Sequence, residues 1–167
     1  MKRVGIVVLA VGVVVALLAV TGCGSSKTHG EEGTLTLTEP GGNSGGFAPI
    51  GRVGKEGFSP GNGAAIWSSL LNAAKKPVGE LHAICIDTQK PPSPNSLSGT
   101  CTGTVVAPGG TFALSAGGKE VLGASGVTGA ITGGTGKYNG AVGTFTSKST
   151  SSNENGPSKF TLDYILP

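Results

Sequence analysis

The chain of 167 residues carries 12 lysines and arginines against 9 aspartates and glutamates, so its formal net charge is +3. The charges are scattered without a basic stripe, which gives no electrostatic basis for binding nucleic acid. The 31 glycines and 10 prolines approach the level at which disorder competes with folding, so folded segments have to be identified by their apolar patterns.

The N-terminus has the pattern of an export signal. An unbroken apolar run from Val4 to Val20 follows two basic residues, and small residues lead from it to Cys23. A cysteine in this place resembles the lipobox of bacterial lipoproteins. We therefore expect residues 1–22 to be a signal peptide and Cys23 to carry lipid, which would anchor the protein extracytoplasmically to the bacterial membrane. A transmembrane anchor is the alternative, since the run is close to the length of about 17 residues that can span a bilayer.

The segment after the predicted cleavage site is polar. Residues 24–33 contain no apolar side chain, so we expect residues 23–33 to form a lipidated cysteine and a flexible tether. Residues 34–167 are then one domain of a size that supports a modest core.

Alternation of apolar and polar residues predicts short strands and no helix of convincing period. The proline- and glycine-rich residues 41–63 are expected to be disordered. We expect eight strands, at residues 34–38, 65–71, 78–87, 100–107, 111–115, 126–132, 141–148 and 159–166.

The most informative segment is Gly-Gly-Thr-Gly-Lys-Tyr-Asn-Gly-Ala-Val-Gly at residues 133–143. Clustered glycines between two strands indicate a tight, bulged corner. A phosphate loop is excluded, because Ile131 and Tyr138 stand where that motif needs glycine and serine or threonine. Asn139 likewise replaces the third glycine of a dinucleotide fingerprint. The predicted structural corner consists of Gly133, Gly134, Gly136, Tyr138, Gly140 and Gly143.

The same segment closely resembles the Gly-Gly-Thr-Gly-x-Tyr/Phe-x-Gly-Ala-x-Gly signature of the dirigent and allene oxide cyclase family, and weaker likeness extends over residues 33–166. About eight short strands alone would fit a sandwich or a barrel. The resemblance implies an all-β, eight-stranded antiparallel barrel, and a possible homo-oligomer. Such a barrel is either filled with side chains or holds one small ligand.

Two cysteines remain once Cys23 carries lipid. Cys85 and Cys101 are expected to form a disulfide between the third and fourth strands in an oxidising exterior, with two buried free thiols as the alternative. Two thiolates and a distant His82 do not make a recognisable zinc ligand set, so no metal is expected. No motif implies a cofactor.

Catalysis finds little support in the sequence. The resemblance implies an acid from the first strand and a tyrosine near the central hairpin, whereas here the first-strand acid is Glu39, at its end, and the hairpin at residues 108–110 has no tyrosine. Period 2 places His82 with Glu80 on the outer face of its strand. We expect no catalytic residue, and we expect Trp67 in the core or at the barrel mouth.

These observations predict a lipid-anchored barrel that binds a small apolar or aromatic molecule without turnover. A structural or adhesion module of the envelope is the alternative, and an isomerase, cyclase or coupling-directing protein a further one. An apolar cavity with two or more converging polar groups would favour the ligand functions, and a packed lumen the structural one. The expected lining comprises Leu35, Leu37, Leu81, Ala83, Phe112, Leu114, Val127, Ile131, Phe145, Phe160, Leu162 and Tyr164.

Overall fold

The computed structural model describes residues 30–41, 45–51, 59–89, 96–121, 126–152 and 156–167. The predicted signal peptide, Cys23 and most of the tether lie outside these residues. The described part of the chain is all-β, and it contains no helix that could cross a membrane. Its strands are β1 (Glu31–Glu39), β2 (Gly45–Ile50), β3 (Gly63–Leu71), β4 (Pro77–Asp87), β5 (Ser96–Ala107), β6 (Gly110–Val121), β7 (Val127–Gly136), β8 (Val142–Ser149) and β9 (Ser158–Leu166).

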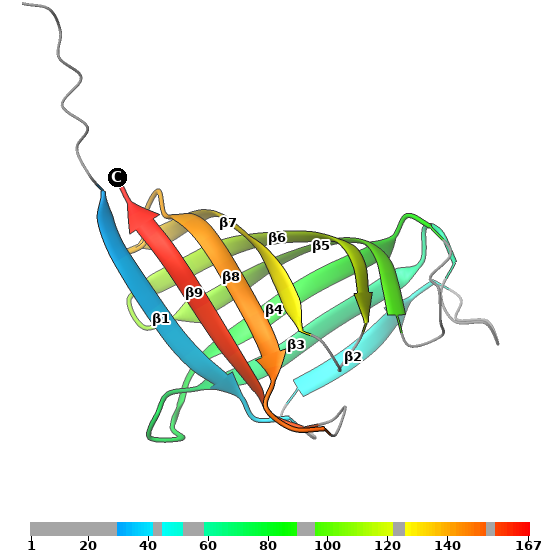
Figure 1. Ribbon diagram of the computed structural model, residues 1–167, viewed down its shortest axis with the longest axis horizontal. Coiled ribbons are helices and arrows are strands. Elements are labelled where there is room, and N and C mark those ends of the chain that lie inside the picture. Colours follow the sequence, from blue (N-terminus) through cyan, green and yellow to red (C-terminus); the bar gives the residue numbers. More distant parts are fainter. Residues whose placement is uncertain (1–29, 42–44, 52–58, 90–95, 122–125, 153–155) are drawn as a thin grey trace, which may run out of the picture.

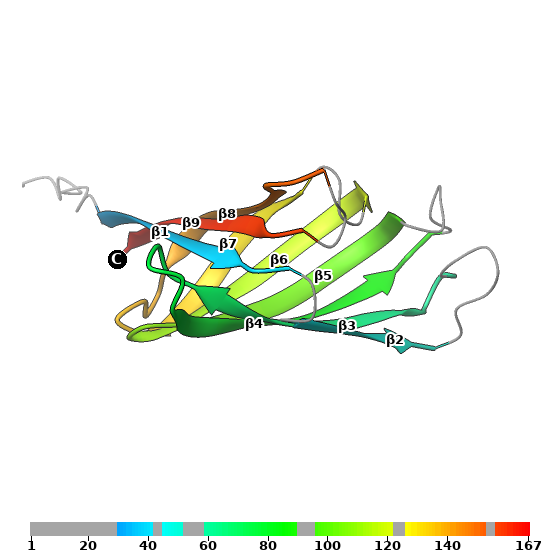
Figure 2. The ribbon, with the colours of Figure 1, turned by 90° about the horizontal axis from the view of Figure 1, so that it is seen from below.

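Eight of the strands form a closed antiparallel barrel (Figure 1). The order β1-β9-β8-β7-β6-β5-β4-β3 runs round the barrel, and Thr38 of β1 pairs with Leu71 of β3 to close it. The predicted fold class is therefore confirmed. β2 pairs with the remaining length of β3 and extends the lower layer sideways (Figure 2).

Several strands are longer than predicted, such as β6, which was expected at residues 111–115, and two segments change their assignment. Residues 45–50, expected to be disordered, form β2, because pairing with residues 63–68 of β3 supplies main-chain hydrogen bonds that a glycine-rich composition does not reveal. Residues 42–44 and 52–58 lie outside the described part. β1 begins at Glu31, so residues 31–33, assigned to the tether, belong to a strand paired with β9.

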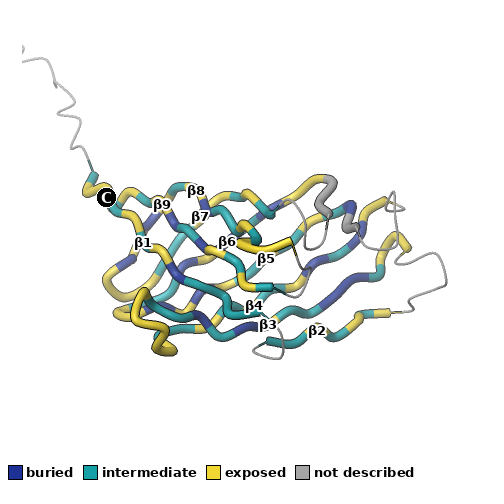
Figure 3. The backbone as a smooth tube through the Cα atoms, turned by 60° about the horizontal axis from the view of Figure 1, so that its bottom comes forward, coloured by how far each residue is buried: buried dark blue, intermediate teal, exposed yellow. Residues whose placement is uncertain are grey.

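Buried and exposed residues alternate along the strands (Figure 3), and the buried set faces the interior of the barrel and forms the core. Three aromatic rings fill one end of the barrel. The ring centroid of Phe112 lies 4.0 Å from that of Tyr138 and 5.2 Å from that of Tyr164. Leu162 and Val105 are fully buried in the same cluster. Burial of one such side chain contributes about 1.5–3 kcal/mol to folding.

The glycine-rich segment is a bulged corner. Gly133 pairs with Ala113 and Ile131 pairs with Leu114, so Thr132 is the extra residue of a bulge. The chain then reverses after Gly136, whose φ of +61° is the left-handed conformation that favours glycine. The Tyr138 hydroxyl donates a hydrogen bond to the Pro108 carbonyl at 3.3 Å, which joins this corner to the β5–β6 turn.

Trp67 lies on the outer face of β3, which corrects the expectation of a core or mouth position. Its side chain is 46% exposed, because Ile66, Ser68 and Leu70 take the inner face of the strand. The ring extends over Gly46 of β2, where any Cβ atom would collide with it. The glycine of β2 thus accommodates an aromatic residue that alternation alone did not assign to the outside.

Candidate ligand cavity

A cavity of about 170 Å³ lies inside the barrel at the end remote from the corner. On β7 and β8, the lining residues lie near the start of β7 and the end of β8. The corner joins the opposite ends of these two strands. The lining consists of Glu39, Ile66, Leu81, Ala83, Cys85, Cys101, Thr102, Gly103, Leu114, Ser115, Ala116, Val127, Phe145, Ser147 and Phe160.

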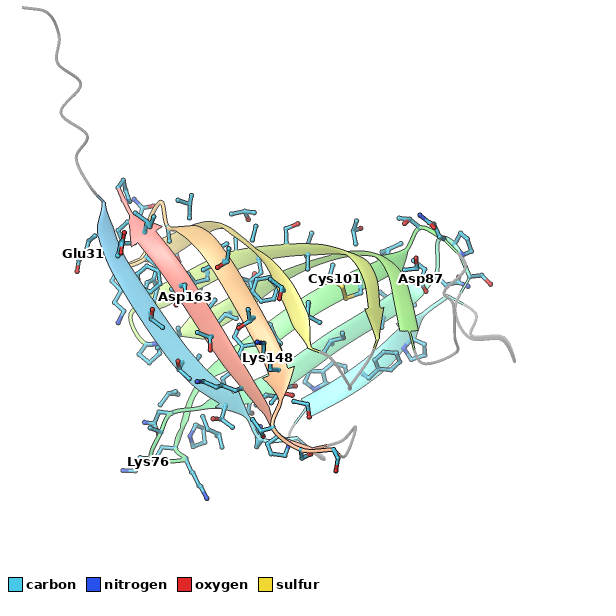
Figure 4. The ribbon with its side chains drawn as sticks, viewed as in Figure 1. Glu31, Lys76, Asp87, Cys101, Lys148 and Asp163 are labelled. Atoms are coloured by element: carbon cyan, nitrogen blue, oxygen red, sulfur yellow. A yellow bond between two sulfur atoms is a disulfide. The ribbon has the colours of Figure 1, made fainter. Side chains whose placement is uncertain are left out.

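The predicted disulfide forms part of the cavity wall. Cys85 and Cys101 are directly opposite each other on β4 and β5, with Cα atoms 4.0 Å apart, and their sulfurs are bonded. The pairing is confirmed. Figure 4 shows Cys101 within the body of the barrel. Ala83 and Gly103 form the neighbouring inner pair on the same two strands, so this wall carries sulfur and small groups rather than large side chains.

Two polar side chains belong to the inner face of the cavity. Glu39 has the same parity as Leu37 on β1, and Ser147 has the same parity as Phe145 on β8. Thr102 and Ser115 have the opposite parity on their strands and contribute main chain. Glu39 is the only ionisable side chain among the described lining residues. Neither it nor the Ser147 side chain forms a hydrogen bond or ion pair with another described residue.

The residues expected to line a ligand site divide between the two ends of the barrel. Leu81, Ala83, Leu114, Val127, Phe145 and Phe160 line the cavity. The remaining six face the same interior but belong to the packed cluster or pack against it: Leu35, Leu37, Phe112, Ile131, Leu162 and Tyr164.

The expected lining did not include Glu39, Ser147 or Ile66. The sequence does carry a signal for Glu39 and Ser147, because each continues the period-2 alternation of a predicted strand that contains residues of the expected lining. Glu39 was instead interpreted as the end of its strand. Its side chain is half-buried, which places it at the edge of the cavity rather than in its deepest part.

The histidine of the barrel lies outside the cavity. His82 Nε2 is 2.9 Å from a carboxylate oxygen of Glu80, and both side chains are more than half exposed. Asp163 is also on the outer surface, where its carboxylate accepts a hydrogen bond of 2.7 Å from the Thr34 hydroxyl (Figure 4). Within the described ranges, no three His, Cys, Asp or Glu side chains gather as a metal site would require.

Asp87 is a buried carboxylate that the sequence did not single out. It is 1% exposed and lies at the far end of β4, beyond Cys85 (Figure 4). One carboxylate oxygen accepts a hydrogen bond of 2.9 Å from the Ser98 amide, and the other has no partner among the described residues. Its main chain is hydrogen-bonded to the main chains of Gly61 and Asn62. Asp87 therefore fixes the end of β4 against the segment before β3 and against Ser98 of β5.

No protein-family model and no curated protein matches the chain. Several solved structures do. A pyocyanin demethylase matches with a TM-score of 0.63 and 24% identity over 80% of this chain and 100% of the other. A Diels–Alderase from Streptomyces koyangensis matches with a TM-score of 0.60 and 14% identity over 84% of this chain and 71% of the other. A pterocarpan synthase dirigent protein matches with a TM-score of 0.55 and 17% identity over 82% of this chain and 90% of the other.

At these identities the matches establish the fold, and the activities named belong to those proteins. The structural matches confirm the resemblance that the corner motif predicted. The chain folds as a barrel of the dirigent and allene oxide cyclase-like type.

Proposed function

We propose that this protein is a lipid-anchored extracytoplasmic barrel that binds a small apolar or aromatic molecule in its lumen without turning it over. The observation that carries the proposal is the cavity, which is apolar apart from Glu39 and Ser147 and which lies beside a fully packed cluster. A barrel that served only as a structural module would have no need to leave one end of its lumen open.

The cavity volume limits the size of the guest. An engineered cavity of about 150 Å³ with an apolar lining stays dry and binds benzene. A cavity of about 170 Å³ therefore suits one ring with a short substituent. Burial of apolar surface contributes about 25 cal/mol per Å², before the costs of association are subtracted.

The placement of the ionisable groups supports binding without turnover. Glu39 is the only acid among the described lining residues, and His82 is on the outer face with Glu80. The described lining therefore offers no second positioned acid or base for proton transfer through the cavity. A catalytic function retains one supporting observation, namely that the first-strand acid does line the cavity.

A screen of the purified protein against phenolic, terpenoid and fatty-acid pools tests the proposal. We expect bound mass without product, measured by mass spectrometry of the retained and released molecules. Stereospecific product that depends on Glu39 would replace the binding function by a catalytic one. Retention of no molecule would favour the envelope module, which the packed half of the lumen supports.

The anchor rests on the sequence around Cys23. The first described strand begins at Glu31, so few residues separate the proposed lipid from the barrel. Intact mass of the mature N-terminus and detergent partitioning test the anchor, and an uncleaved signal or an unmodified Cys23 would contradict it. Assembly into a homo-oligomer, implied by the family resemblance, is measured by light scattering.

A further inference from the structure

The two polar side chains of the cavity flank an aromatic wall. Phe160 of β9 pairs with Ser147 of β8 on one side and with Leu37 of β1 on the other. Glu39 is the next inner-face residue of β1 after Leu37. The ring of Phe160 is stacked on that of Phe145, with centroids 5.5 Å apart and an interplanar angle of 16°. A carboxylate, a hydroxyl and two aromatic rings thus belong to one side of the cavity.

The carboxylate of Glu39 determines the sign of the charge that this site accepts. A purely apolar guest that covered Glu39 would remove water from an ionised group and leave it unpaired, which costs free energy. A guest with a carboxylate would add repulsion between like charges. A guest with a protonated amine would instead supply a charge-assisted hydrogen bond, which is stronger than one between neutral groups.

The aromatic rings favour the same class of guest. A ring of the guest gains offset or edge contacts with Phe145 and Phe160. A cation that lies near the face of either ring gains a further attraction from the ring quadrupole. The described lining contains no lysine or arginine that would compete for the Glu39 carboxylate.

We propose that the cavity selects a small aromatic amine, with its protonated nitrogen at Glu39 and Ser147 and its ring against Phe145 and Phe160. This inference rests on the proposed binding function and names the chemical class of its guest. The volume of about 170 Å³ accommodates one ring and a chain of about two carbons between the ring and the nitrogen.

Three probes with one aromatic body test the inference: 2-phenylethylamine, ethylbenzene and 3-phenylpropionate. The mature lipidated protein is held in lipid nanodiscs and titrated by calorimetry, with empty nanodiscs as the blank for partitioning into lipid. We expect the amine to bind about fivefold more tightly than ethylbenzene, a modest factor because Glu39 is only partly buried. The propionate is expected to bind more weakly than either.

Variants assign the selectivity to its residues. Glu39→Gln keeps the size of the side chain and removes its charge, so the preference for the amine should disappear while ethylbenzene binds at least as tightly as before, because no ionised group is then desolvated. Ser147→Ala should weaken the amine about twofold. Glu80→Gln is the matched control, since Glu80 is an exposed glutamate of the outer face, and it should leave all three affinities unchanged.

The outcomes separate the two proposals. If none of the probes binds, the amine selectivity is wrong, and the proposed function is overturned as well when the phenolic, terpenoid and fatty-acid pools also leave no molecule bound. If ethylbenzene binds but the amine has no advantage, or if Glu39→Gln preserves that advantage, the function stands and the amine selectivity is wrong. Loss of the amine preference in the Glu80→Gln variant would also overturn the amine selectivity, because the charge effect would then come from the outer surface.

Discussion

The two ends of the lumen differ in the size of the side chains that the same strands supply. At the corner, the rings of Phe112, Tyr138 and Tyr164 contact one another and occupy the lumen. At the other end, Ala83 and Gly103 stand opposite each other and a cavity of about 170 Å³ remains. A barrel of fixed strand number thus acquires a pocket where small residues coincide on neighbouring strands, and rigidity where rings do.

The largest effect is expected at the corner, from Gly136→Val. The φ of +61° is strained for a β-branched residue, and a Cβ atom at this position would collide with the Gly109 carbonyl. We expect a loss of more than about 3 kcal/mol, or failure to fold, measured by denaturant unfolding. Gly133→Val is the control: no atom lies within 4 Å of its Cβ position, and its φ is not in the left-handed region. Equal stability of both variants would contradict the structural role of Gly136.

The second effect belongs to the cavity end, from Cys101→Ser. Loss of the bond to Cys85 should lower stability by about 2–4 kcal/mol, because the unfolded chain regains the entropy that the closed loop removes. It should also weaken ligand binding, since both cysteines line the cavity. A double variant with serine at both positions should lose about as much as the single one. A much larger loss in the single variant would instead assign the effect to the unpaired Cys85 thiol, which is buried.

The strands and the corner were predictable because their signals are local. Alternation placed Phe160 and Leu162 on the inner face of the last strand, and the glycines of residues 133–143 specified a turn with a positive φ. β2 was not predictable, since Gly45 and Gly46 have low strand propensity and the segment is ordered only by its pairing with β3. The face of β3 that carries Trp67 was likewise not predictable, because alternation does not say which of the two sets of residues faces the core.

The cavity was predictable in kind but not in place. The apolar inner face could be derived from period 2, yet which inner residues border empty space depends on volumes contributed by strands far apart in sequence. Leu81 lines the cavity and Phe112 does not, although both belong to the inner face of their strands. The same limit applies to Glu39, whose position in the lumen follows from its strand continuing for one more inner residue.

The difference in packing between the two ends of the lumen can be measured with an alanine-to-leucine substitution at each end. Ala107→Leu adds volume to the packed core, where Ala107 is buried, and should destabilise the protein by about 1–3 kcal/mol. Ala83→Leu adds the same volume at the cavity wall and should change stability by less than about 1 kcal/mol while abolishing ligand binding. Thermal unfolding and calorimetric titration measure the two effects. Similar destabilisation by both variants would mean that the cavity end is as tightly packed as the corner.

The smallest effect tests how much the hydrogen bond from Tyr138 to Pro108 contributes to the stability of the packed end. Tyr138→Phe keeps the ring against Phe112 and removes the hydroxyl that donates to Pro108, so stability should fall by about 0.5–1.5 kcal/mol. Tyr164→Phe is the comparison, because its ring packs in the same cluster and its hydroxyl forms no hydrogen bond with another described residue. We expect it to be nearly neutral in denaturant unfolding. If the two variants lose the same stability, the hydroxyl of Tyr138 does not join the two turns, and the corner is held by ring packing and main-chain geometry alone.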